Sequence, residues 1–182
     1  GFTVLIALNV RDMFGSFFES FHHALFQVAS IITTTGFATV DFNYWPAFSK
    51  SLLVLLMFIG ACAGSTGGGI KCSRVVLMAK SVKKEMQYLI HPRVVRVHKM
   101  DGHRVQHEVM RSVNAFLIAY LLIFVVSVLL VSLTCEDMVT SFTAVATALN
   151  NVGPGLELVG PAANFSFLHP LSKIVLMFDI LS

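Results

Sequence analysis

Charged residues are scarce in this chain of 182 residues. Lys, Arg, Asp and Glu together make up 13% of it, whereas about 25% is usual for a soluble domain. Hydrophobic residues make up 55%, and the mean hydropathy is +0.77. A water-soluble globule of this composition would expose a large apolar surface. The deficit of charge therefore excludes an ordinary soluble domain and predicts a membrane protein, in which lipid-facing backbone groups must be hydrogen-bonded internally.

Cysteine is also scarce, and the three present are Cys62, Cys72 and Cys135. Their spacing fits neither a metal site nor a redox motif, and an odd number gives no disulfide framework. We interpret them as small packing residues. The histidines likewise form no pair with the spacing of a zinc site. These absences argue against a metal site, and no cofactor is expected.

The N-terminus lacks both a full membrane span and a secretory signal. Its apolar residues end after eight positions, at Asn9, Arg11 and Asp12. That stretch is too short to cross a bilayer, and it lacks the basic start of a signal peptide. It resembles the cut end of a helix, so we expect the chain to be a fragment.

Acidic residues are few in the one strongly basic part of the chain. Eight Lys and Arg residues fall between Lys80 and Arg111, against three acids, and Lys71 and Arg74 precede them. The basic stretch lies between two long apolar segments, which favours a cytoplasmic loop over a nucleic-acid-binding patch. No nucleic-acid partner is expected.

Two long apolar segments flank that loop. Ser112–Thr134 contains no charged residue, and its 23 positions suffice to cross about 30 Å of hydrocarbon. Leu52–Ala63 is also apolar but runs into Gly64–Gly69, which has four glycines in six residues. Each glycine costs a helix about 1 kcal/mol relative to Ala. The first segment thus predicts a transmembrane helix, and the second a span broken at Gly64.

Two shorter segments each end in a run containing glycine. From Phe14 the apolar residues recur at helical spacing up to Thr33–Thr39, which we call the first Gly run. Met138–Leu149 is similarly amphipathic and ends at Asn150–Gly155, the second Gly run. Their glycines, Gly36 and Gly153, lie 117 residues apart. We predict two re-entrant pore helices in equivalent places of an internal repeat.

The two Gly runs suit the binding of an alkali cation. Glycine can adopt backbone angles that turn consecutive carbonyls toward one line, and such carbonyls replace the water around the ion. A helix-capping turn is the simpler alternative for either run alone. The C-terminal ends of the two pore helices add partial negative charge that favours cations. The predicted potassium ligands, through backbone carbonyls, are Thr34, Thr35, Gly36, Phe37, Asn151, Val152, Gly153 and Pro154. This cation pathway leads us to expect a protein that is not an enzyme.

Asp41 and Glu157 follow the two Gly runs. These acids would raise the local cation concentration at an outer pore mouth. Simple solvated loop acids are an equally good interpretation.

The Gly-rich segment invites comparison with a phosphate-binding loop. That motif needs Lys directly after its last Gly and then Ser or Thr, whereas Ile70 precedes Lys71 and Cys72 follows it. Irregular backbone at membrane depth is tolerated inside protein or beside a water-filled cavity. We interpret the segment as a gating loop beneath the filter, made of Gly64, Ser65, Thr66, Gly67, Gly68, Gly69 and Lys71.

Four motifs together resemble a known family. They are Thr33–Thr39, Gly60–Lys71, His91–Arg93 and Asn150–Leu156. In this order they are similar to the TrkH-type potassium-translocating subunit of the Trk/Ktr/HKT cation transporters. The resemblance implies potassium as the transported substrate, one central pore, Gly36 and Gly153 as filter glycines, and a gating loop at Gly64–Gly69. It also implies a homodimer in the cell inner membrane, regulated by a cytosolic nucleotide-binding ring similar to TrkA.

The expected fold is an all-α membrane protein of repeated outer helix, pore helix with filter loop, and inner helix. Residues 1–79 would form the third pore repeat, 80–111 the cytoplasmic linker, and 112–182 the fourth pore repeat. Asp179 is not expected from the family pattern, and we expect it to pair outside this chain or lie in a wet cavity. His22 and His23 are expected to hydrogen-bond to neighbouring repeats. Two alternatives stay open: a membrane-associated nucleotide-binding protein using Gly64–Lys71, and a transporter for another solute.

Overall fold

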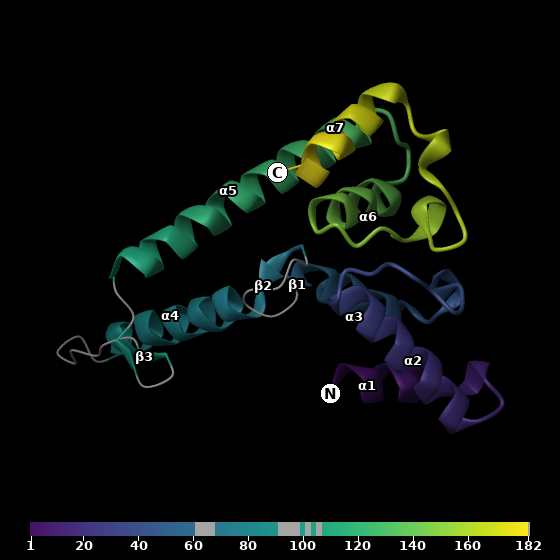
Figure 1. Ribbon diagram of the computed structural model, residues 1–182, viewed down its shortest axis with the longest axis horizontal. Helices are drawn as coiled ribbons and strands as arrows, with labels where there is room; N and C mark the ends of the chain where they lie inside the picture. Colours follow the sequence, from purple (N-terminus) through teal and green to yellow (C-terminus); the bar gives the residue numbers. More distant parts are fainter. Residues whose placement is uncertain (61–67, 91–98, 101–102, 105–106, 182) are drawn as a thin grey trace.

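The computed structural model describes residues 1–60, 68–90, 99–100, 103–104 and 107–181. Over these residues the chain is mainly helical (Figure 1). The helices are α1 (Phe2–Asn9), α2 (Phe17–Ile32), α3 (Ala47–Phe58), α4 (Cys72–Ile90), α5 (His107–Ser132), α6 (Met138–Leu149) and α7 (Pro170–Leu181). Short strands pair as β1 (Ile59–Gly60) with β2 (Ile70–Lys71), and β3 (Lys99–Met100) with β4 (His103–Arg104).

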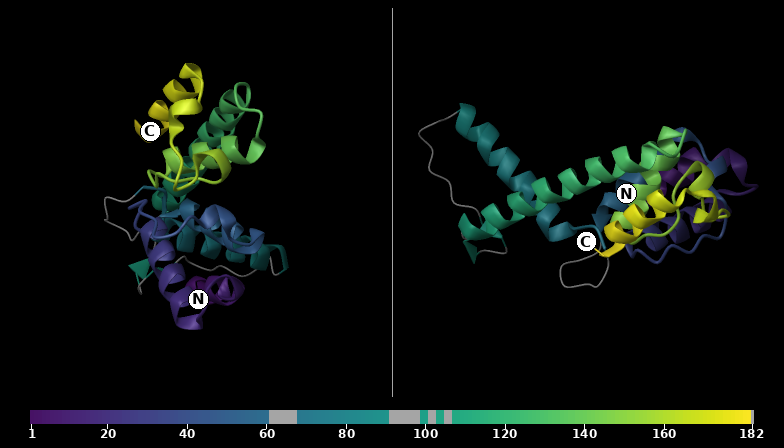
Figure 2. Two further views of the ribbon diagram at one scale, coloured as in Figure 1. Left: turned by 90° about the vertical axis from the view of Figure 1, so that its right-hand side faces the viewer. Right: turned by 90° about the horizontal axis from the view of Figure 1, so that it is seen from above.

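The helices form two packed groups. Helices α1 to α3 pack together, and α6 and α7 pack against the C-terminal half of α5 (Figure 1). Helix α4 and the N-terminal half of α5 extend beyond both groups on the same side, as the second view in Figure 2 shows. The predicted arrangement of two helical units, each with a short pore helix (α2 or α6), is therefore present.

The two short helices begin at polar caps. Helix α2 starts after Ser16, whose Oγ accepts from the backbone N–H of Phe18 at 3.3 Å, so the helix begins later than Phe14. Helix α6 occupies the predicted range Met138–Leu149. Its cap, Asp137, accepts from the N–H groups of Val139 and Thr140 at 3.3 and 2.9 Å. Such side chains satisfy donors that a helix start otherwise leaves unpaired.

The break in the first long apolar segment comes earlier than predicted. Helix α3 ends at Phe58, and Ile59 and Gly60 turn into a parallel pairing with Ile70 and Lys71. A Cβ atom on Gly60 would overlap the carbonyl oxygen of Gly68. The break predicted at Gly64 therefore falls too late in the chain, because pairing with residues beyond the Gly-rich segment ends the helix at Phe58.

Helix α5 is the one helix among the described residues that is long and apolar enough to cross a membrane, over Met110–Ser132. It begins at His107, before the predicted start at Ser112, and α4 continues past the linker boundary expected at residue 80. Leu77 of α4 packs with Met110 and Val113 of α5. These helices therefore extend into the region assigned to the basic linker.

Each packed group contributes side chains to the hydrophobic core of the other. Val152 and Leu156, from the second Gly run and just beyond it, are buried in the core formed by α1 to α3. In the other direction, Phe58 at the end of α3 contacts Phe124 and Phe142, with ring centroids 5.4 and 6.1 Å away. The two units thus pack against each other through side chains buried in both cores.

Candidate functional site

The two Gly runs lie against each other between the packed groups. Gly36 has φ +80° and Gly153 has φ +106°, angles that favour glycine. A Cβ atom on Gly36 would overlap the carbonyl oxygen of Val152, while one on Gly153 would lie 4.0 Å from the Gly36 Cα. The structure therefore brings the two predicted filter glycines together from positions far apart in the sequence.

The two Gly runs share one backbone geometry. The N–H of Thr35 donates to the Ser30 carbonyl at 2.8 Å, and that of Val152 donates to the Thr147 carbonyl at 2.9 Å. Thr34 and Asn151, which precede them, have φ values of +54° and +53°. Each pair is separated by the same 117 residues as the two glycines. The internal repeat seen in the sequence thus extends to the hydrogen bonds that end each pore helix.

The first Gly run is also held by side chains of α2. The Ser30 hydroxyl donates to the Phe37 carbonyl oxygen at 2.6 Å, and the hydroxyls of Thr33 and Thr35 are 2.7 Å apart. The Phe37 oxygen, one of the predicted potassium ligands, is therefore engaged by a protein donor. This bond weighs against Phe37 as an ion ligand.

Asn150, directly before the second filter residues, is buried and contacts α5, α6 and the Gly-rich segment, a role that the sequence analysis did not predict. Its side chain donates to the Ala146 carbonyl at 2.7 Å and accepts from the Tyr120 hydroxyl at 2.8 Å. A Cβ atom on Gly68 would overlap the Asn150 carbonyl oxygen, and one on Gly69 would lie 2.9 Å from its Oδ1. The described end of the Gly-rich segment thus packs directly on the second Gly run. The available signal was an asparagine at the end of α6, where the equivalent position of α2 carries Thr33.

A cavity of about 560 Å³ adjoins the two Gly runs. Thr34, Thr35, Asn151, Val152 and Gly153 line it, together with residues of α6, α7 and the loop before α7. Lys173 of α7 also lines it, and its ammonium group donates to the Ser166 carbonyl at 2.9 Å. Five of the eight predicted ligand residues therefore face one common cavity.

Part of the predicted gating loop lies outside the described residues. This applies to Gly64, Ser65, Thr66 and Gly67, and also to His91–Arg93. Of the remainder, Gly68 and Gly69 pack on Asn150, and Lys71 lies in β2 immediately before α4.

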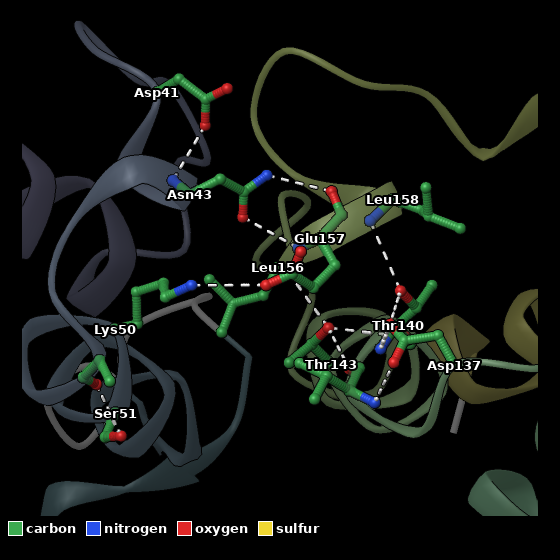
Figure 3. Close-up of polar contacts among 12 residues, drawn as sticks. Asp41, Asn43, Lys50, Ser51, Asp137, Thr140, Thr143, Leu156, Glu157 and Leu158 are labelled. Atoms are coloured by element: carbon green, nitrogen blue, oxygen red, sulfur yellow. Dashed lines mark hydrogen bonds and ion pairs between the residues drawn. The ribbon is translucent and has the colours of Figure 1, made fainter.

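The two outer acids are engaged in protein contacts. Asp41 Oδ1 accepts from the Asn43 N–H at 3.0 Å. Glu157 Oε1 lies 3.4 Å from the Lys50 ammonium nitrogen (Figure 3).

A third acid, Asp137, caps the start of α6. The Thr140 hydroxyl, together with the backbone N–H groups of Thr140 and Val139, holds the pKa of the Asp137 carboxyl below its usual value. The acids near the Gly runs thus also serve as structural acceptors, and cation attraction by Asp41 and Glu157 stays a prediction.

Asp179, His22 and His23 each contact a side chain within this chain. Asp179 is 2% exposed, and its Oδ1 accepts from the Ser127 hydroxyl of α5 at 2.7 Å. His23 Nδ1 lies 3.0 Å from the Thr39 hydroxyl oxygen, and its ring packs edge-on with that of His22. His23 Nδ1 thus bonds within its own repeat, because the first Gly run folds back within reach of its own pore helix. The expected bonds of His22 and His23 to neighbouring repeats stay predictions.

Comparison with known proteins agrees with this arrangement. A family model described as "TrkH: Cation transport protein" matches residues 12–181. This match identifies the class as a membrane transport protein, and the expectation of a protein that is not an enzyme is confirmed. The chain belongs to the TrkH family. That assignment confirms the resemblance seen in the sequence and argues against a nucleotide-binding enzyme.

Several curated relatives are similar along almost the whole chain. The Trk system potassium uptake protein TrkH of Escherichia coli (strain K12) is 38% identical over 176 residues, which cover 97% of this chain and 36% of that protein. TrkH of Vibrio parahaemolyticus is 43% identical over 164 residues, 90% of this chain and 33% of that protein.

The crystal structure of the potassium transporter TrkH from Vibrio parahaemolyticus matches with a TM-score of 0.89 and 39% identity. It covers 99% of this chain and 38% of that chain. The predicted pore-repeat fold is thereby confirmed. The chain spans about a third of the length of the curated relatives it matches.

Proposed function

We propose that this chain supplies the third and fourth pore repeats of a potassium-translocating subunit, which takes up potassium across the cell inner membrane. Residues 1–79 and 112–182 would be the two repeats, and 80–111 the cytoplasmic linker between them. The observation that carries the proposal is the contact between two Gly runs of the same backbone geometry, each at the C-terminal end of a short helix. The matched relatives are named potassium uptake proteins.

In this proposal potassium exchanges its hydration water for backbone carbonyl oxygens. Rings of carbonyls do this in potassium-selective pores, and the positive φ values of Gly36 and Gly153 suit such a loop. The C-terminal ends of α2 and α6 contribute partial negative charge. The proposed ligands in this chain are the carbonyls of Thr34, Thr35, Gly36, Asn151, Val152, Gly153 and Pro154, with Phe37 less suited because it accepts from Ser30.

The Gly-rich segment Gly64–Gly69, followed by Lys71, is the proposed gate below the filter. Its position in the chain between α3 and α4, and the packing of Gly68 and Gly69 on Asn150, support this role. A segment that blocks the pore should permit more flux when it is shortened. We therefore expect deletion within Gly64–Gly67 to raise rubidium uptake, and unchanged uptake would contradict a gating role.

The proposed environment is a lipid bilayer with a second subunit and a regulatory ring. Ile118, Leu122 and Leu129 of α5 are each more than 60% exposed, as expected for side chains that face lipid or another part of a larger protein. We propose a multi-pass homodimer whose basic linker lies in the cytosol, near a nucleotide-binding ring similar to TrkA.

The decisive experiment measures rubidium influx by the full-length protein in cells that lack other potassium uptake. Replacing both Gly36 and Gly153 by leucine should abolish influx, because neither position accommodates a side chain in its present backbone conformation. Gly15→Leu is the matched control, since an added Cβ at Gly15 meets no atom within 4 Å. Influx that survives the double replacement would refute the filter assignment.

A transporter for another solute predicts a different result in the same assay. Its uptake would be inhibited by an organic solute and not by alkali cations. Inhibition of rubidium influx by potassium, without inhibition by organic solutes, supports the potassium assignment.

A further inference from the structure

On the outer side of the Gly runs, one asparagine joins the two repeats. The side-chain amide of Asn43 makes two hydrogen bonds to the backbone of Glu157 (Figure 3). Its Oδ1 accepts from the Glu157 N–H at 2.9 Å, and its Nδ2 donates to the Glu157 carbonyl at 3.0 Å. These residues lie 114 positions apart, in different repeats. We call this pair of bonds the Asn43 bridge.

The first end of the Asn43 bridge is fixed to its own repeat. Asn43 lies in a short 3₁₀ turn, Phe42–Tyr44, whose backbone is capped by Asp41. Phe42 is fully buried in the core of α1 to α3, and Trp45 beside the turn is 3% exposed. The turn that carries Asn43 is therefore held by the Asp41 cap and by the burial of Phe42 and Trp45.

The other end is fixed to α6. The N–H of Leu156 donates to the Thr143 hydroxyl at 3.1 Å, and that of Leu158 donates to the Thr140 hydroxyl at 3.4 Å. Figure 3 shows these bonds on either side of Glu157. The position of Glu157 relative to its own pore helix is thus set by two threonines.

Glu157 has an unusual backbone conformation for a residue with a side chain. Its φ is +54°, in the left-handed region that such residues seldom adopt. The Asn43 bridge engages both its N–H and its carbonyl. The Lys50–Glu157 ion pair is a separate contact, and its side chains are 22% and 49% exposed, a setting in which ion pairs contribute little.

We propose that Asn43 is a positioning residue that fixes the spacing of the two filter loops and thereby sets the ion selectivity of the pore. This inference rests on the proposed function. Asn43 follows Gly36 by seven residues, and Glu157 follows Gly153 by four. The stretch of chain that joins the Asn43 bridge to each filter glycine is therefore short. Selectivity in carbonyl filters depends on the geometry and number of the coordinating oxygens. A change in the relative position of the two loops therefore alters which ion fits.

The test is the ratio of rubidium to sodium influx in vesicles that contain the purified full-length protein. Asn43→Asp keeps the side-chain shape but places a carboxylate oxygen against the Glu157 carbonyl, and Asn43→Ala removes the bridge. Both should lower the ratio by about tenfold, equivalent to about 1.4 kcal/mol. Because the measure is a ratio, the amount of protein inserted does not affect it.

Two matched controls separate the Asn43 bridge from other effects. Lys50→Met removes the ion pair and leaves both bridge bonds. Asn164→Ala changes another outer-loop asparagine, whose Oδ1 accepts from the Ser166 N–H within its own loop at 3.1 Å. Both controls should keep the ratio of the unmodified protein.

An unchanged ratio in Asn43→Asp, with potassium-competed uptake intact, would overturn this inference and leave the proposed function standing. An equal fall in Lys50→Met would also overturn it, because charge rather than the bridge would then set the ratio. Absence of alkali-cation influx in the unmodified protein would refute the proposed function itself. If Asn43→Ala fails to fold, the isosteric Asn43→Asp decides.

Discussion

At the scale of single residues, Gly36 and Gly153 occupy equivalent positions in different surroundings. Both have positive φ, but only at Gly36 does an added Cβ collide with backbone, at the Val152 carbonyl. We expect Gly153→Ala to destabilise the fold by about 1–2 kcal/mol, the cost of left-handed backbone. Gly36→Ala should cost more, because the neighbouring run must also move. Thermal unfolding in detergent measures both, and equal midpoints would contradict the asymmetry.

Tyr120 provides a second prediction at this scale. Its hydroxyl donates to Asn150, and Asn150 is fully buried behind the second Gly run. Tyr120→Phe removes this donor and leaves a buried acceptor, which costs about 1–3 kcal/mol. Tyr44→Phe, at a tyrosine that is 77% exposed, should leave the unfolding midpoint unchanged. If both variants behave alike, Asn150 does not depend on Tyr120.

At the scale of the helix, α6 depends on Asp137. Asp137→Ala should destabilise α6 by about 1 kcal/mol, the usual contribution of such a cap. Because its hydrogen bonds lower the pKa of Asp137 in the folded state, the cap contributes its full stabilisation above the usual aspartate pKa of about 3.9. That contribution is lost as the pH falls through the lowered pKa.

The measurement is the unfolding midpoint between pH 7 and pH 3, compared with that of Asp137→Asn. The asparagine variant retains a capping acceptor without a titrating carboxyl, so its midpoint should fall less below about pH 4. Glu136→Gln, at the exposed neighbouring acid, is the control. Identical pH profiles for the unmodified protein and Asp137→Asn would contradict the role of Asp137.

The same scale shows what the sequence can predict. The range of α6 was predicted because its apolar periodicity, an Asp before it and a Gly run after it are all local signals. The end of α3 at Phe58 was not, because it results from pairing of Gly60 with residues beyond the Gly-rich segment. The same reasoning explains the two filter glycines, whose local patterns were visible, and the Asn43 bridge, whose partners lie 114 residues apart. The residues that Gly60 and Asn43 contact are determined by packing between distant segments, which leaves no local pattern in the sequence.

At the scale of the whole molecule, the two repeats share their cores. Val152 and Leu156 lie in the core of the first repeat. Phe58 at the end of α3 joins Phe124 and Phe142 of the second, whose rings are 5.1 Å apart and nearly perpendicular. Edge-to-face aromatic pairs add stability beyond the burial of their surface. Because each core includes side chains from the other repeat, we expect the repeats to lose structure together.

Phe58→Ala tests this coupling. Truncating a large core aromatic costs about 3–5 kcal/mol, and the half-buried Phe58 should fall near the lower end. Since the lost contacts belong to the second repeat, hydrogen exchange of backbone amides should accelerate in α6 as well as in α3. Phe48→Ala, in the same helix at a side chain that is 52% exposed, should accelerate neither. Faster exchange confined to α3 would mean that the two repeats are independent units, held together by the contact of the Gly runs and the Asn43 bridge.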